Sequence, residues 1–152
     1  MRSLYKFIAS GFGTGYLPKA PGTWGALGAL LIMLPFYFLH YEHITILLAC
    51  CIFVFTLLGV WSANRVESEW GHDPKKVVID EMVGLWVSII FIPFSWVNLI
   101  VGFILFRFFD IFKPLGIRHA EKLNGGYGVM ADDLVAGVYA NVVLNCLIFV
   151  LE

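Results

Sequence analysis

Four long stretches without a charged residue dominate this sequence. They run from Pro21 to Tyr41, from His43 to Asn64, from Met82 to Phe106 and from Leu134 to Leu151. A helix that spans a bilayer needs about 20 mostly apolar residues. Three of the stretches are long enough to form one such helix each. The chain is also 60% hydrophobic and only 14% charged, which lies well outside the usual range of soluble domains. The sequence therefore predicts a polytopic, all-α membrane protein.

The third stretch contains a break at residues 92–98, IPFSWVN. Pro93 lacks a backbone donor and favours a helix break there, so this stretch is predicted to form a short hairpin of two helices. Its first helix, taken as residues 79–94, would be roughly 24 Å long, which is short for a full span. The prediction is a single domain, residues 1–152, built as a bundle of about five membrane-associated helices. A soluble all-helical bundle with a large core is the structural alternative.

All basic residues fall on one side of this five-segment bundle. Of the ten Lys and Arg residues, Arg2, Lys6 and Lys19 precede the first segment, Arg65, Lys75 and Lys76 lie between the second and third, and Arg107, Lys113, Arg118 and Lys122 lie at or after the end of the fourth. The positive-inside rule assigns this side to the cytoplasm. No basic patch interleaved with base-stacking aromatic residues occurs, so nucleic acid is not an expected partner.

Five carboxylates lie where the apolar stretches meet charged loops: Asp80, Glu81, Asp110, Asp132 and Asp133. The third and fifth segments begin on the cytoplasmic side and the fourth ends there, so all five are predicted to share one layer. Each adjacent pair, taken alone, is also explained as capping of a helix N-terminus. Five charges in a compact bundle repel one another unless a proton or a cation intervenes. Oxygen ligands in this number suit Mg²⁺, which often shares its shell with a substrate phosphate.

Two stripes of small and polar residues predict which acids face the bundle interior. The stripes are Asp80, Gly84 and Ser88 in the third segment and Asp133, Gly137, Asn141 and Asn145 in the fifth. Residues at this spacing share one helical face, and small or polar faces favour close helix packing in membranes. Among the five acids we therefore rank Asp80, Asp110 and Asp133 first as metal ligands, because the stripes on their helices point inward. Glu81 and Asp132 are more readily explained by capping.

Basic residues accompany the acids along the chain. Arg107, Asp110 and Lys113 are spaced i, i+3, i+6 on one helical face, which a plain salt-bridge ladder would also explain. Acids that gather metal beside bases that bind anionic oxygens are typical of phosphoryl chemistry. The predicted catalytic residues are Asp80, Asp110, Asp133 and Lys113, and the predicted phosphate-binding residues are Lys19, Gly22, Thr23, Arg107 and Arg118.

The segment from Gly11 to Gly25 is rich in Gly and Pro, which predicts a shaped loop and not a helix. It has neither Walker A spacing nor the spacing of a dinucleotide site. Gly22 and Thr23 lead into the first segment, where backbone N–H groups could receive a phosphate; Thr23 could equally be a plain N-cap. His72-Asp73 and His119 lie in the other two loops, where they could bind metal, move protons or simply form turns.

Four blocks of this sequence resemble the phosphatidylglycerophosphatase A family of bacterial lipid phosphatases. The blocks are residues 13–25 (GTGYLPKAPGTWG), His72-Asp73 with residues 79–84 (IDEMVG), residues 106–114 (FRFFDIFKP) and residues 125–137 (GGYGVMADDLVAG). Their order and spacing cover nearly the whole chain. One departure from the family pattern is Gly116, where Pro is usual.

The resemblance implies Mg²⁺-dependent hydrolysis of phosphatidylglycerophosphate to phosphatidylglycerol and inorganic phosphate at the cytoplasmic face of the bacterial inner membrane. The implied partners are this lipid substrate and the surrounding membrane lipids. The headgroup of such a substrate would reach a polar layer at the ends of apolar helices. In the expected mechanism the five carboxylates hold one or two Mg²⁺ ions, and an aspartyl-phosphate intermediate is the alternative. A small ion or phosphate transporter of the inner membrane is the competing function, although its site should lie near the midplane, often with inverted repeats.

Overall fold

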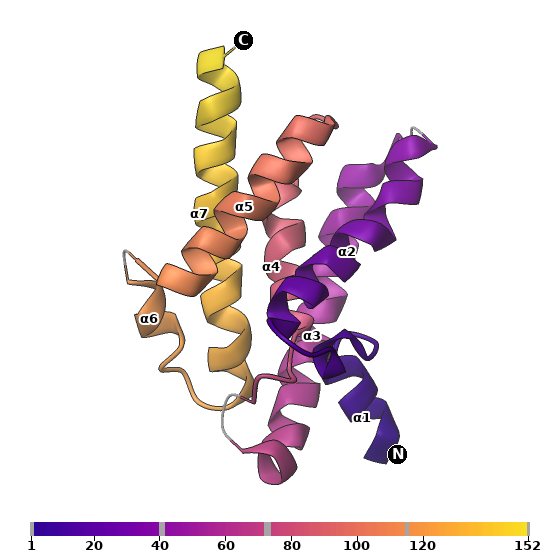
Figure 1. Cartoon of the computed structure of the whole chain (residues 1–152), viewed down its shortest axis with the longest axis vertical. Coiled ribbons are helices and arrows are strands. Elements are labelled where there is room, and N and C mark those ends of the chain that lie inside the picture. The colour runs from indigo at the N-terminus through magenta and orange to yellow at the C-terminus, as the bar shows by residue number, and fades with distance from the viewer. Residues whose placement is uncertain (1, 40–41, 72–73, 115, 152) are drawn as a thin grey trace.

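The computed structural model describes residues 2–39, 42–71, 74–114 and 116–151, which are helical apart from connecting loops (Figure 1). The elements are α1 (Arg2–Ala9), the 3-10 turn η1 (Thr14–Tyr16), α2 (Pro21–Phe38), α3 (Ile44–Trp70), α4 (Ile79–Ile89), α5 (Trp96–Phe112), α6 (Ile117–Ala120) and α7 (Gly126–Leu151). No strand occurs among the described residues. The predicted all-α fold is confirmed.

Three helices, α2, α3 and α7, are long and apolar enough to cross a membrane. The other two predicted segments are also helices, but α4 has 11 residues and α5 has 17, which gives lengths of about 16 and 25 Å. The described chain holds seven α-helices in all, because the short helices α1 and α6 lie outside the predicted segments. Large apolar side chains such as Leu31, Phe53 and Val150 face outward, which suits a hydrocarbon environment.

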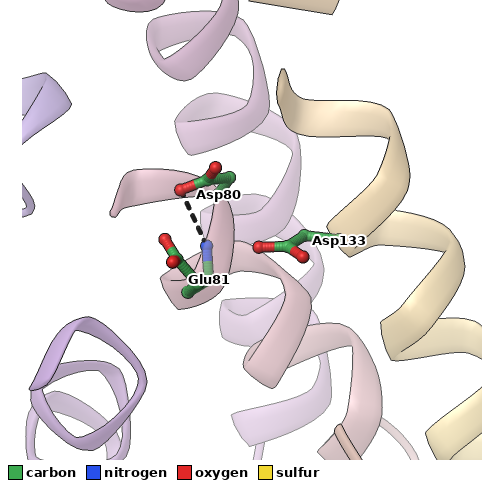
Figure 2. A group of neighbouring side chains, drawn as sticks. All are labelled: Asp80, Glu81 and Asp133. Atoms are coloured by element: carbon green, nitrogen blue, oxygen red, sulfur yellow. Dashed lines mark hydrogen bonds between the residues drawn. The ribbon is translucent and has the colours of Figure 1, made fainter. Parts of the chain in front are cut away.

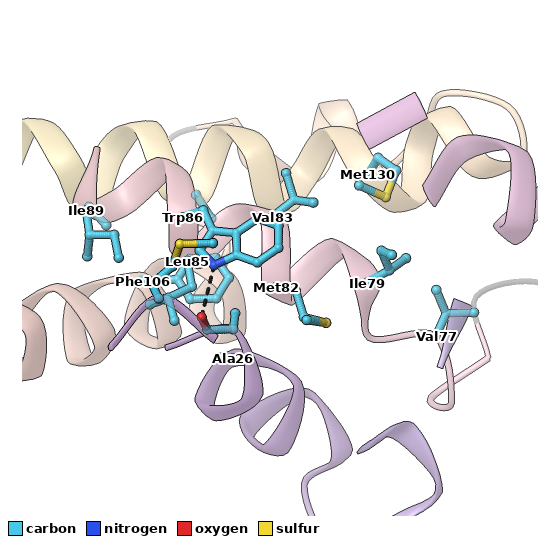
Figure 3. Close-up of a cluster of buried hydrophobic side chains, with 14 of the residues drawn as sticks. Ala26, Val77, Ile79, Met82, Val83, Leu85, Trp86, Ile89, Phe106 and Met130 are labelled. Atoms are coloured by element: carbon cyan, nitrogen blue, oxygen red, sulfur yellow. Dashed lines mark hydrogen bonds between the residues drawn. The ribbon is translucent and has the colours of Figure 1, made fainter. Parts of the chain in front are cut away.

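The short helix α4 lies at the centre of the bundle, in contact with α2, α3, α5 and α7 (Figures 1 and 3). Nine of its 11 residues are buried. The indole of Trp86 reaches α2, where Nε1 donates a hydrogen bond of 3.0 Å to the carbonyl oxygen of Ala29. On another side, the ring of Phe55 from α3 packs edge-on against Trp86. Burial on all sides fixes the position of α4, and therefore of the acids at its start.

Helices α4 and α7 approach closely through two glycines. A Cβ atom on Gly137 would lie 2.4 Å from the carbonyl oxygen of Gly84, and one on Gly84 would lie 2.8 Å from the carbonyl oxygen of Asp133. The two predicted stripes therefore face each other, as expected from their small residues. Asn145 is an exception: its side chain is exposed and donates only to Asn141 one turn before, because α4 ends before it can cover this turn.

The end of α4 is set by a residue of α7. Asn141 Nδ2 donates to the carbonyl oxygens of Ser88 at 3.1 Å and Ile90 at 2.8 Å, so groups that a continuing helix would bond internally are satisfied from outside. The helix stops at Ile89, and its predicted extension to residue 94 is wrong. The predicted break around Pro93 is confirmed, and α5 begins after Ser95.

The predicted loop from Gly11 to Gly25 is shorter in the structure, since α2 begins at Pro21. Proline suits the first helical position, because its fixed φ fits a helix and its missing N–H has no intrahelical acceptor there. Thr23 is the third residue of α2 and does not cap it; the N-cap is Ala20, which makes no side-chain hydrogen bond. In another loop, Gly116 has a φ of +87°, which proline cannot adopt.

Candidate active site

The ends of four helices meet around a polar cavity of about 260 Å³. The starts of α2 and α4, the end of α5 and the second turn of α7 contribute side chains to it. It is lined by all five predicted acids, Asp80, Glu81, Asp110, Asp132 and Asp133, together with Gly22, Arg107, Lys113, Lys75, Ala20, Pro21, Pro74 and Val77. The predicted common layer of acids is therefore present as one cavity.

Only one of the two acidic pairs lies in the first turn of a helix, where a charged side chain can satisfy free N–H groups. Asp80 and Glu81 lie in the first turn of α4, and Asp80 Oδ1 accepts a hydrogen bond from the backbone N–H of Glu81 at 3.1 Å. The start of α7 is at Gly126, more than one turn before Asp132 and Asp133. Those two acids therefore cannot cap the helix, and another role is needed for them.

Asp80, Glu81 and Asp133 form a compact group of acids. Each offers a carboxylate oxygen, and these oxygens all lie within 4.8 Å of one another. Figure 2 shows Asp133 extending from α7 toward the two acids on α4. Asp80 and Asp133 are 9% and 3% exposed. Such a group of buried oxygens has the donor type and spacing that a hard divalent cation requires.

Burial also changes the acidity of the two acids on α4. Burial, followed by the nearby charge of Glu81, raises the pKa of Asp80 well above its ordinary value. Burial likewise raises the pKa of Glu81, although its interactions with Asp80 and Arg107 work in the opposite direction. The ionised forms are therefore disfavoured unless a positive charge enters the cavity.

Gly22 makes room for Glu81 and Arg107 at the start of α2. A Cβ atom at Gly22 would lie 2.1 Å from Glu81 Oε1 and 3.1 Å from Arg107 Nη1. The other oxygen of Glu81, Oε2, is buried and has no hydrogen-bond partner within the described chain. Because an unsatisfied buried carboxylate oxygen is unfavourable, this atom is poised to accept a ligand.

Arg107 is held by an acid of its own helix. Its Nη1 lies 2.5 Å from Asp110 Oδ2, and both side chains are largely buried. Despite this ion pair, Nε and Nη1 make no hydrogen bond of good geometry to any described residue. Guanidinium donors of this kind suit the oxygens of a phosphate.

Lys113 is held by an acid of a different helix. Its Nζ lies 2.6 Å from Asp132 Oδ2 and 3.4 Å from Glu121 Oε1. Burial lowers the pKa of Lys113, but the hydrogen bond and charge of Asp132 outweigh it, so the pKa is raised above its ordinary value. The amine is therefore a fixed positive charge and cannot act as a general base near neutral pH.

The predicted site residues divide into two sets. The five acids, Gly22, Arg107 and Lys113 line the cavity, whereas Lys19, Thr23 and Arg118 are not among its lining residues in the described chain. Asp132 and Asp110 are both largely enclosed, with side chains that are 9% and 14% exposed. His119 is exposed on α6, and His72 and Asp73 lie outside the described residues.

Lys75 is a cavity residue that the sequence analysis did not select. It reaches the cavity from the loop before α4, together with Pro74 and Val77. The only signal in the sequence was its place in a basic loop a few residues before Asp80. Proximity along the chain does not decide which of two neighbouring lysines turns toward a site, and the tertiary structure selects Lys75 over Lys76.

Comparisons with known proteins identify relatives that are named as lipid phosphatases. The family model for Phosphatidylglycerophosphatase A matches residues 7–148. A Bacteroides thetaiotaomicron protein named "Putative phosphatidylinositol-3-phosphatase" is 46% identical over 142 residues, covering 90% of this chain and 89% of the relative. Proteins named Phosphatidylglycerophosphatase A from Haemophilus influenzae and Escherichia coli are 40% and 34% identical, covering 90% and 91% of this chain and 84% and 80% of their own lengths.

No solved structure matches the chain. The family match nevertheless spans nearly all of the sequence, including every acid of the cavity. This protein is a phosphatase that belongs to the phosphatidylglycerophosphatase A family.

Proposed function

We propose that this protein hydrolyses the phosphomonoester of phosphatidylglycerophosphate, releasing phosphatidylglycerol and inorganic phosphate. The observation that carries the proposal is the polar cavity, where five acids and two partly buried bases converge at the ends of apolar helices. The family and the names of two relatives support this substrate. The transporter alternative is not favoured by these relatives.

The proposal extends to the membrane. Residues 1–152 form one membrane-embedded domain with about five membrane-associated helices, and the cavity opens toward the cytoplasm of a bacterial inner membrane. Exposed apolar residues near the cavity, such as Trp24 on α2 and Phe108 on α5, suit contact with lipid. In this arrangement the acyl chains stay in the bilayer while the headgroup phosphate enters the cavity.

Mg²⁺ is the proposed cofactor, and the residues present fit it. Asp80, Glu81 and Asp133 offer oxygens only, and the buried Oε2 of Glu81 has no partner within the described chain. Hard oxygen donors with an unsatisfied position are what this cation requires. When bound, Mg²⁺ would polarise the phosphate and lower the pKa of a coordinated water.

Residues of the chain itself bind the phosphate and stabilise the transition state. Arg107 and Lys113 supply positive charge to the phosphate oxygens, where it stabilises the transition state for phosphoryl transfer. Gly22 lets the backbone at the start of α2 approach the same place, with its N–H groups at the positive end of the helix dipole. Lys19, Thr23 and Arg118 remain predicted phosphate ligands, which would contact the headgroup outside the cavity lining.

Phosphate release from purified protein tests the proposal. With phosphatidylglycerophosphate in detergent micelles, we expect release with Mg²⁺, none after chelation, and recovery when Mg²⁺ is restored. Asp80→Asn and Asp133→Asn should each reduce kcat by about 100-fold or more, because they remove oxygens from the proposed cation site. Glu42→Gln, at an exposed position away from the cavity, is the matched control. Full activity in both cavity variants, or no release by wild type, would contradict the proposal.

Phosphatidylinositol 3-phosphate is a second candidate substrate for the same assay. The protein that is 46% identical carries a name that refers to phosphatidylinositol 3-phosphate, which also presents a phosphomonoester on a lipid headgroup. The two lipids are compared by kcat/KM under identical conditions. A higher value for phosphatidylinositol 3-phosphate would replace the proposed substrate and leave the chemistry of the cavity unchanged.

A further inference from the structure

Two of the five cavity acids already have a basic partner, and three do not. Asp110 pairs with Arg107 at 2.5 Å, and Asp132 pairs with Lys113 at 2.6 Å. Asp80, Glu81 and Asp133 make no ion pair within 4 Å with any base that the structure describes. The same three provide the group of oxygens within 4.8 Å of one another. Pairing and clustering therefore divide the five acids in the same way.

We propose that Asp110 and Asp132 are positioning residues, which hold Arg107 and Lys113 toward the oxygens of a phosphomonoester, while Asp80, Glu81 and Asp133 alone hold the cation. This division rests on the proposed function of the cavity. It revises the prediction that all five acids are metal ligands.

Charge favours this division. A carboxylate oxygen bonded to a guanidinium or an ammonium group is already neutralised, and a divalent cation on the same oxygen would be repelled by the base beside it. The other three acids make no ion pair, although the charge of Arg107 still acts on Glu81, and they are the ones that need a cation. Separate oxygens for the bases and for the cation let both kinds of positive charge occupy one small cavity.

The geometry of the two bases supports a role in holding an anion. Arg107 has five N–H donors; Nε makes no hydrogen bond within the described chain, and Nη1 has only its ion pair with Asp110. Lys113 follows α5 in the left-handed region, with a φ of +47°, a conformation that is unfavourable for lysine. Its bond to Asp132 holds this turn against α7 and keeps the amine at the cavity wall.

Asp110 and Asp132 also lie close to the proposed cation site. Asp132 Oδ1 is buried without a hydrogen-bond partner in the described chain. Asp110 is close enough to Asp133 and Glu81 for their charges to interact. Either acid could therefore also reach a cation, and cation binding must be measured separately from phosphate binding.

The experiment uses the full chain in detergent and two binding measurements. Mn²⁺ binding, followed by electron paramagnetic resonance, reports on the cation site. Binding of inorganic phosphate at saturating Mg²⁺, followed by calorimetry, reports on the bases. Glu81→Gln should weaken Mn²⁺ binding by about tenfold or more, whereas Asp110→Asn and Asp132→Asn should leave it within about twofold and weaken phosphate binding by about tenfold.

A double-mutant cycle shows whether each acid acts through its base. If Asp110 acts through Arg107, Asp110→Asn should have little further effect on phosphate binding in an Arg107→Gln background, and the same holds for Asp132→Asn with Lys113→Gln. Asp110→Glu, which keeps the charge, should recover part of the lost phosphate affinity. Circular dichroism and thermal melting confirm that each variant is folded.

The division is overturned if Asp110→Asn or Asp132→Asn weakens Mn²⁺ binding as much as Glu81→Gln does, or if the acid and base variants are fully additive. Both measurements are made without turnover. Failure of the wild type to hydrolyse phosphatidylglycerophosphate would therefore count against the proposed substrate, while the division would still be decided by binding.

Discussion

At the scale of single residues, the cavity is marked by polar atoms that lack hydrogen-bond partners among the residues that the structure describes. Glu81 is the clearest case, because one of its oxygens lies against Gly22 and the other is buried with no partner in the described chain. Arg107 has unbonded donors a short distance away. A folded protein normally satisfies such groups, so their presence in one cavity indicates preparation for a charged ligand.

Gly22→Ala tests how closely α2 must approach the cavity. The new Cβ would lie 2.1 Å from Glu81 Oε1, so the carboxylate must move, and we expect kcat/KM to fall roughly tenfold or more. Gly28→Ala is the matched control on the same helix, since its Cβ would meet only Thr14 Cγ2 at 3.5 Å. That change should leave activity intact and favour the helix by up to about 1 kcal/mol. Equal activity in the two variants would show that Glu81 needs no fixed position.

Lys113 provides a prediction about pH. Because its folded pKa is raised above the ordinary 10.5, the stabilisation from its charge is complete below that ordinary value and is lost only as the pH rises through the folded value. Lys113→Met should therefore lower the melting temperature by the same amount at about pH 6 and about pH 9. A destabilisation that disappears near about pH 9 would mean that the amine titrates within this range.

At the scale of elements, the short helix α4 decides where the acids lie. It carries Asp80 and Glu81 at its first turn and is enclosed by its neighbours along its whole length. Close packing against α7 through Gly84 and Gly137 brings Asp133 beside them. A helix of 11 residues is too short to be placed by its own propensity, so packing and its C-terminal bonds to α7 determine its position.

Asn141→Leu tests this control of α4 by α7. The change removes two hydrogen bonds to the carbonyl oxygens of Ser88 and Ile90, which should lower the free energy of unfolding in detergent by about 1–3 kcal/mol. Asn145→Leu is the control one turn further along, where the side chain is exposed and bonds only to Asn141. It should change stability by less than about 0.5 kcal/mol. A reversed order would mean that the end of α4 is fixed by other contacts.

At the scale of the whole molecule, the charged elements gather at one end of the bundle. Figure 1 places α1 and the end of α3 at the lower end and α6 in the lower half, while the C-terminal part of α7 extends upward. The polar cavity is lined from the starts of α2 and α4, the end of α5 and the second turn of α7, which are the cytoplasmic-side ends in the proposed orientation. An enzyme with this distribution would meet its substrate at the membrane surface and not within the hydrocarbon core.

Cysteine labelling tests that orientation. After Cys50, Cys51 and Cys146 are replaced by serine, a single cysteine is introduced by Lys122→Cys on the basic side or by Glu42→Cys on the opposite side; both positions are exposed. In intact bacterial spheroplasts, a membrane-impermeant maleimide should label Glu42→Cys and not Lys122→Cys, because the positive-inside rule places Lys122 in the cytoplasm. Disruption of the membrane should make both accessible. The reverse pattern in intact spheroplasts would invert the proposed topology.

Much of the site could be predicted from patterns along the chain. All five acids, Arg107 and Lys113 line the cavity, because helical segments that alternate in direction bring their ends to one layer. The N-cap alternative for Thr23, the inward position of Asn145 and the end of α4 were wrong. Each depends on where a neighbouring helix begins or ends, which propensity and spacing do not determine.

The sequence by itself determined the helical class, the apolar segments and the residue types of the site, since these follow from composition and periodicity. Only the tertiary structure decided which acid faces which base and which acids lie together. Asp132 pairs with Lys113 although 18 residues separate them in the chain, and Glu81 finds its space at Gly22. The physical reason is that charge pairing in a buried cavity depends on distances of a few ångströms between different helices, and these are set by packing across the bundle.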